Sequence, residues 1–445
     1  MSNYGMERNQ RSEVHSTLWI NLTLVGVALC LAVSSYAEQK KHELQPSEEA
    51  ISLTELLSEV RANNPQIQAA RSSYEASEAR PSQARSLPDP MIGFAASNMN
   101  NPLPFTTIGS DPQSNAGIEF TQEVPFPGKL GLRGQIAEDE AQAKRHEAAA
   151  IEAEVVAKVK SAYVEYWYLC QSISVLERSK YDLDELARTA QVRYEGGRGT
   201  QQDVLKAHLE ASMLEARLIG IELRRLSARA ELNAILNRMP ESVLGVPQKP
   251  QLSPLLLSAS EMIELARQRS PALMAKNAIN EREKKALDLA QREYYPDLTF
   301  GGYYGYSGDN PDMFQVRVGF KVPLYFWSKQ SAGIEEAKHN EVRARSEKQA
   351  AWQEINAKLL ADIHQAQASQ KLLQLYDKSL VPQSRMAFES SLRSYESGQV
   401  DFLTLLSNLV AARDYGIGAA EEFANYEKAV ARIESVLGES LETKT

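Results

Sequence analysis

The stretch "YEGGRGTQQDVLKA" at residues 194–207 interrupts a helical pattern that contains no proline from Lys129 to Met239. A second stretch, "YESGQVDFLTLLSN" at residues 395–408, repeats its Tyr, Glu, Gly and Leu positions 201 residues later. Because glycine adopts positive φ without strain, each interruption predicts a helix that ends and reverses direction. Two matching reversals predict that the whole fold is duplicated.

The segments before the two reversals repeat as well. Residues 53–90 and 259–297 each predict a short helix, a restart at Asn-Pro (64–65) or Ser-Pro (270–271), a second helix and a Pro-Asp turn. A pair of short strands ending in Val-Pro follows in each half. We therefore expect two structural repeats, residues 51–245 and 246–438, each made of helices, a strand pair and a long helical hairpin.

The hairpins are expected at residues 129–237 and 329–437, with a kink at Pro382 in the second. The 65 residues from Lys129 to Arg193 would form one helix about 98 Å long. Such rods are stable only when they pack along their length, and their many alanines allow helices to approach closely. An ordinary antiparallel coiled coil would explain the rods but not the strands.

The strands alternate between apolar and polar residues. In "MFQVRVGFKV" (313–322) and "AGIEFTQEV" (116–124), one face is apolar and the other polar. Their partners are expected at 91–99 and 297–307, the latter with Tyr303, Tyr304 and Tyr306 suited to a membrane interface. Strands of this length and pattern are typical of transmembrane barrels, and a soluble sandwich with one wet face is the alternative.

A barrel places constraints on the polar face and on the number of chains. Four strands cannot close a membrane barrel, so several chains must pool their strands. The residues expected to face a water-filled lumen are Glu119, Thr121, Glu123, Gln315, Arg317 and Lys321.

Composition narrows the class of protein further. The 445 residues are 43% apolar and 7% aromatic, and the net charge of −9 is spread along the helices, so nucleic acid is not expected as a partner. Residues 1–37 resemble a secretory signal cleaved after Ala37, with a membrane anchor or lipidation at Cys30 as alternatives. Residues 38–50 are expected to be a linker, and residues 439–445 a tail.

Motifs for catalysis or metal binding are missing. The six histidines form no pair at ligand spacing and neighbour no cysteine. Scattered Met91, Met99 and Met313 suit packing better than a soft-metal path. We therefore expect no enzyme activity, no cofactor and no resident metal site, and energy for any transport must come from another protein.

The doubled plan, the Asn-Pro and Ser-Pro restarts and the two Tyr-x-x-Gly breaks resemble the TolC family of bacterial outer-membrane efflux proteins, over residues 50–438. This resemblance implies a fold that is mainly α with a small membrane β part. It also implies a homotrimer whose pooled strands form a 12-stranded β-barrel, continued by a long periplasmic α-helical barrel. The stretch "TQEVPFPGKLGLR" (121–133) looks like the branch that serves heavy-metal pumps of the resistance-nodulation-division type.

The resemblance also assigns a role to the hairpin tips, where the periplasmic adaptor of such a system docks. The matching positions are Tyr194, Gly197, Thr200, Val204, Leu205, Tyr395, Gly398, Asp401, Leu405 and Leu406. A reversal without a partner is the alternative, but the aliphatic pairs beside each turn, expected to be exposed, favour docking. Acidic gate positions of the family are Thr404 and Ser407 here, which leaves Asp203 and Asp401 as candidate gate acids or as simple helix caps.

The predicted function is a passive exit duct in the outer membrane for metal cations delivered by an inner-membrane pump and a periplasmic adaptor. Export of drugs or solvents, or of proteins in type I secretion, would give almost the same sequence pattern. A soluble periplasmic coiled-coil adaptor is the alternative of another class, but it predicts one hairpin rather than two.

Overall fold

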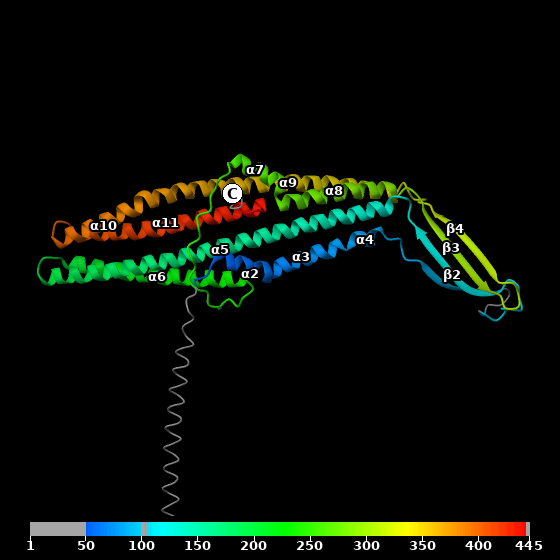
Figure 1. Cartoon of the computed structure of the whole chain (residues 1–445), viewed down its shortest axis with the longest axis horizontal. Helices are drawn as coiled ribbons and strands as arrows, with labels where there is room; N and C mark the ends of the chain where they lie inside the picture. Colours follow the sequence, from blue (N-terminus) through cyan, green and yellow to red (C-terminus); the bar gives the residue numbers. More distant parts are fainter. Residues whose placement is uncertain (1–49, 99–102, 104, 442–445) are drawn as a thin grey trace, which may run out of the picture. The chain divides into compact units, whose positions relative to one another are not determined.

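The computed structural model describes residues 50–98, 103 and 105–441 (Figure 1). The expected signal segment, Cys30, residues 38–49 of the linker, Met99 and residues 442–445 of the tail lie outside these ranges. The chain divides into a small unit, whose described residues are 50–52 and 243–248, and a larger unit that contains everything else described. In the small unit, Ile51 forms a parallel bridge with Pro247.

The larger unit contains the helices and strands of both expected repeats. The first consists of α2 (Leu53–Asn63), α3 (Pro65–Glu78), α4 (Arg80–Arg85), β1 (Met91–Ser97), β2 (Asn115–Val124), α5 (Lys129–Glu195) and α6 (Gln201–Ile235). The second consists of α7 (Ala259–Arg269), α8 (Pro271–Arg292), β3 (Asp297–Tyr306), β4 (Met313–Lys321), α9 (Lys329–Leu375), the π-helix η1 (Tyr376–Leu380), α10 (Val381–Glu396) and α11 (Phe402–Leu437). The predicted fold class, mainly helical with a small duplicated strand part, is confirmed.

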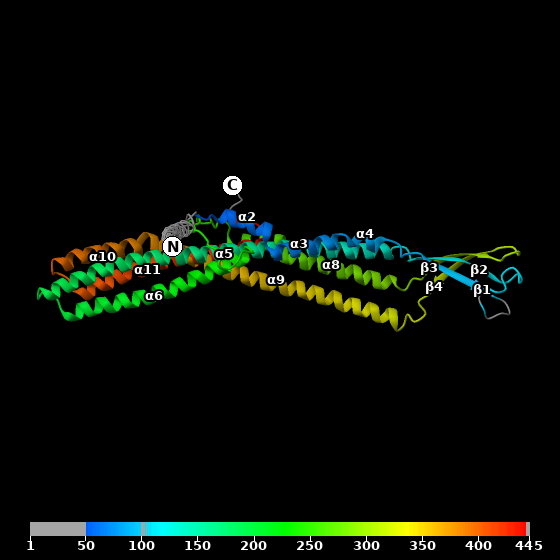
Figure 2. The ribbon, with the colours of Figure 1, turned by 90° about the horizontal axis from the view of Figure 1, so that it is seen from below.

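Helix α5 is the longest element of the described chain and organises the packing. Its 67 residues span about 100 Å, and it packs against α3, α6, α8 and α11 (Figure 2). Small residues line these contacts as expected, since Ala141, Ala157 and Ala162 of α5 are buried. A core cluster with Leu359, Ile363, Tyr426 and Ile433 joins α9 to α11.

The irregularity expected at Pro382 takes the form of a π-helix. Pro382 has no N–H, and its ring clashes with the carbonyl one turn earlier in a regular helix. The five residues Tyr376–Leu380 widen the helix just before it, and α10 then begins with Pro382 in its first turn. The second rod therefore consists of α9, η1 and α10 rather than one uniform helix.

The strands form one antiparallel sheet in the order β1-β2-β3-β4. The register aligns Phe94, Ile118, Tyr304 and Phe314 across one face of the sheet, and these four side chains are between 52% and 79% exposed. The grouping of Tyr303 with Tyr304 and Tyr306 is wrong, because alternation along β3 turns Tyr303 to the opposite, polar face beside Glu119. No helix among the described residues is long and apolar enough to span a membrane.

Candidate functional site

The two helix reversals lie at the end of the larger unit that is remote from the sheet (Figure 1). Gly197 has a φ of +67° and Gly398 a φ of +78°, values that L side chains rarely adopt. Space for a side chain exists at Gly197, where an added Cβ would meet nothing within 4 Å. Backbone conformation therefore explains why glycine occupies this position in both turns.

A contact between the two hairpins links their tips. Arg193, near the end of α5, donates a hydrogen bond from Nη1 to the carbonyl oxygen of Tyr395 at the end of α10. Its guanidinium also lies 4.6 Å from the centroid of the Tyr395 ring, a cation–π arrangement. The Tyr395 ring also contacts Phe402 of α11 in an edge-to-face arrangement, with centroids 5.7 Å apart. One arginine of the first hairpin thus binds a tyrosine of the second, and that tyrosine packs on Phe402.

This contact makes the two tips unequal despite their matching sequences. Tyr395 is buried, and burial raises the pKa of its hydroxyl. Tyr194, its counterpart in the first repeat, is 43% exposed. The sequence comparison did not identify Arg193 because it lies one residue before the repeated motif.

The two candidate gate acids cap the helices that leave the turns. Asp203 and Thr200 form a capping box at the start of α6, in which each side chain accepts a hydrogen bond from the other residue's backbone N–H. Asp401 accepts a hydrogen bond of 2.7 Å from the backbone N–H of Thr404, which lowers the pKa of its carboxyl. Both carboxylates therefore have a structural role, and a role in the gate remains a prediction.

The expected exposure of the aliphatic pairs is wrong for three of the four residues. Val204, Leu405 and Leu406 are at most 8% exposed, whereas Leu205 is 61% exposed. Val204 belongs to the stripe of α6 that packs against α5, together with Ala207 and Leu214. On α11, the residues at 402, 405, 406 and 409 follow the helical period and form one buried seam.

The six predicted lumen residues lie on one face of the sheet, which we call the polar strand face: Glu119, Thr121, Glu123, Gln315, Arg317 and Lys321. Across the intervening strand β3, Arg317 pairs with Glu119 and Lys321 with Glu123, each with an N–O distance of 3.2 Å. The acids of β2 are thus matched by the bases of β4. These pairs are largely solvated, so they set the charge of the face more than its stability.

A buried lysine fixes the junction between the strands and the rods. Lys129, the first residue of α5, is 1% exposed, and its Nζ lies 2.9 Å from Asp297 Oδ1 and 3.2 Å from Glu293 Oε2. The Nζ also donates to the Tyr295 carbonyl at 3.0 Å, and the Tyr295 ring stacks on Phe126. Lys129 lies within the stretch 121–133. The burial of its ammonium could not be predicted from that stretch, because its acidic partners Glu293 and Asp297 lie in the other repeat.

The described residues contain no group of three or more His, Cys, Asp or Glu side chains placed to hold a metal ion.

A model of the outer membrane efflux protein family matches residues 56–238 and 262–439. The outer membrane protein TolC of Vibrio cholerae is 23% identical over 377 residues, which cover 82% of this chain and 84% of that protein. The cobalt-zinc-cadmium resistance protein CzcC of Cupriavidus metallidurans is 23% identical over 364 residues, covering 80% and 82%.

Among solved structures, the outer membrane protein VceC of Vibrio cholerae superposes with a TM-score of 0.74 at 18% identity, covering 88% of this chain and 97% of that one. At this identity the likeness shows the fold, while the family model spans most of both repeats. The chain therefore belongs to the outer membrane efflux protein family, and its location is the outer membrane.

Proposed function

We propose that this protein is the exit duct of a tripartite efflux system, and that it carries metal cations from an inner-membrane pump of the resistance-nodulation-division type across the outer membrane. We propose metal cations as the cargo because the chain is similar over 80% of its length to CzcC, which is named as a cobalt-zinc-cadmium resistance protein. The heavy-metal-type stretch at 121–133, which contains the buried Lys129, supports the same choice.

The working form is a homotrimer. Three copies supply twelve strands, enough to close a barrel with the apolar strand face toward lipid and the polar strand face toward water. Helix α6 has an exposed apolar stripe that also suits assembly into a trimer. The stripe consists of Leu205, Leu209, Met213, Ile219, Leu223 and Leu226. Exposure of so long an apolar stripe to water is unfavourable, and contact with a neighbouring copy would bury it.

The paired charges suit a duct that does not hold its cargo. Each acid of β2 on the polar strand face is balanced by a base of β4, so a passing cation meets no uncompensated ring of carboxylates there. A cation therefore moves down its concentration gradient, and the pump supplies the energy.

The tips are the docking place for the periplasmic adaptor. The exposed residues available there are Tyr194, Leu205 and Leu403, each more than 40% exposed. The contact of Arg193 with Tyr395 holds the two hairpins of one chain together. Binding of the adaptor at the tips would break this contact.

Growth of a strain that lacks the gene tests this function. The medium contains graded zinc, cobalt, cadmium, nickel, copper or silver, beside a panel of hydrophobic drugs. We expect hypersensitivity to particular metals that the wild-type chain rescues. A chain with Gly197→Val and Gly398→Val should not rescue growth, because a β-branched residue is strained at positive φ.

The matched control is Gly333→Val, a helical glycine of α9 with open space around it and no positive φ, which lies outside the exposed stripe of α6. It should rescue growth at wild-type levels, provided that immunoblots show equal amounts in the outer membrane. Sensitivity to drugs alone, or to no compound, would rule out metal export.

A further inference from the structure

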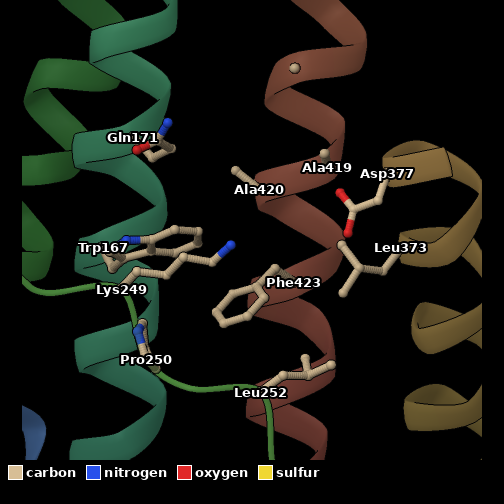
Figure 3. Close-up of a pocket in the computed structure, with 11 residues that line it drawn as sticks. Trp167, Gln171, Lys249, Pro250, Leu252, Leu373, Asp377, Ala419, Ala420 and Phe423 are labelled. Atoms are coloured by element: carbon tan, nitrogen blue, oxygen red, sulfur yellow. The ribbon is translucent and has the colours of Figure 1, made fainter. Parts of the chain in front are cut away.

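A pocket of about 470 Å³ lies between α5, α11 and the start of η1, with the segment from Lys249 to Leu252 along one edge (Figure 3). Its floor is apolar and buried, with Trp167, Leu373, Ala420 and Phe423 each at most 8% exposed. The Trp167 and Phe423 rings contact each other, with centroids 4.8 Å apart. Pockets of this size that are apolar with a few polar groups are typical ligand sites.

Two opposite charges border this floor. The Lys249 ammonium lies 5.0 Å from the Phe423 ring centroid and 5.9 Å from that of Trp167. Asp377, in the π-helix, faces it from the other side of the pocket (Figure 3). In the part of the chain that the structure describes, neither side chain forms an ion pair or a hydrogen bond, so each can bind a group of opposite charge.

The pocket is held open by contacts outside it. Four residues after Lys249, Ser253 donates hydrogen bonds of 2.8 Å from its N–H and its hydroxyl to the Glu427 carboxylate. Tyr426 donates to the Ser253 carbonyl. Asp377 is placed by the π-helix that precedes Pro382. The two charges are therefore fixed by separate elements rather than by each other.

We propose that this pocket binds a small zwitterion with an apolar body, that is, a hydrophobic amino acid or short peptide. Its carboxylate would pair with Lys249, its ammonium with Asp377, and its side chain would pack on Phe423 and Trp167. A simple anion would leave Asp377 unused, and a simple cation would meet Lys249. A ligand bound here would connect the inter-repeat segment to the π-helix, the irregular point of the second rod.

Fluorescence of Trp167 provides the test, in full-length protein with Trp19, Trp327 and Trp352 replaced by Phe. The probe is the dipeptide alanyl-phenylalanine, beside its N-acetylated and C-amidated forms. We expect a saturable change with the zwitterion and about tenfold or more weaker binding of each blocked form, since a hydrogen bond to a charged group contributes about 1.5–3 kcal/mol.

Two variants then identify the charges. Lys249→Gln should weaken binding of the zwitterion and abolish its advantage over the amidated peptide, while Asp377→Asn should abolish its advantage over the acetylated one. Lys358→Gln and Glu354→Gln are charge-matched controls, since both residues are exposed on α9 and pair with each other.

The proposal is overturned if no saturable change occurs with the zwitterion, or if the two variants bind all three peptides as the wild type does. A variant that weakens all three equally, with unchanged circular dichroism, also contradicts recognition of the two charges. Metal export does not depend on this pocket in our account, so that function stands or falls by its own experiment.

Discussion

At the scale of single residues, Arg193 shows how one side chain connects the two repeats. Its guanidinium binds the Tyr395 carbonyl and covers the Tyr395 ring, and no second arginine covers Tyr194 in the same way among the described contacts. The duplicated sequence therefore produces an unequal pair of tips. Adaptor docking and opening of the tips should therefore depend on the contact of Arg193 with Tyr395.

Replacing Arg193 by Ala should favour the open tip. The change removes a charge-assisted hydrogen bond of about 1.5–3 kcal/mol, enough for a shift of about tenfold or more toward open channels. Single-channel conductance in planar bilayers measures the open fraction. Arg198→Ala, at an exposed position in the same turn, is the control and should leave it unchanged. Equal conductance of both variants and wild type would contradict the role of Arg193.

Lys129 should matter for stability more than any exposed lysine. Lys129→Met leaves Asp297 and Glu293 without their buried partner, and the loss should be about 3 kcal/mol or more. Denaturant unfolding, followed by circular dichroism, measures it. The control is Lys329→Met at the exposed first residue of α9. An equally small loss in the two variants would show that the buried ion pairs contribute little.

Glu427 should make stability depend on pH. Burial raises the pKa of its carboxyl above the usual value of 4.5, so the folded protein binds a proton more tightly than the unfolded chain does. The stabilisation is complete below 4.5 and is lost as pH rises through the folded pKa. Relative to wild type, Glu427→Gln should therefore gain stability as pH rises from about 4.5 and then level off. Unfolding free energies of both proteins across this range would show a constant difference if the prediction is wrong.

At the scale of elements, the long helices, the strand pairs and the two reversals could be predicted from period and glycine placement. Alternation in residues 313–322 placed Arg317 and Lys321 on one face, and the register agrees. Contacts between elements could not be predicted. The burial of Leu405 and Leu406 depends on which face of α11 meets the neighbouring helices, and the asymmetry of Tyr194 and Tyr395 depends on Arg193 from another helix.

The exposed stripe on α6 gives a prediction about assembly. Leu209→Glu combined with Leu223→Glu places two charges on a surface that is solvated in one chain and covered in the proposed trimer. We expect unchanged helix content but loss of the trimer, measured by size-exclusion chromatography with light scattering. Leu209→Met with Leu223→Met keeps the surface apolar and should keep the trimer. A trimer that tolerates both glutamates would place the contact between copies elsewhere.

At the scale of the whole molecule, family membership and outer-membrane location follow from the match over both repeats. The cargo does not follow from them, because a wide duct need not bind what passes through it. The structure describes balanced charges on the polar strand face and a linked pair of tips at the opposite end of α5, which is about 100 Å long. Under the proposed function, selection of the cargo therefore belongs to the pump.

The most direct test of metal export is the metal content of living cells. Cells lacking the gene are loaded with zinc, cobalt or cadmium, or with a fluorescent hydrophobic dye, and the retained amounts are followed by mass spectrometry and fluorescence. We predict that these cells retain metal, that wild-type protein restores its release, and that dye release is unchanged. Retention of the dye with normal release of all three metals would contradict the account.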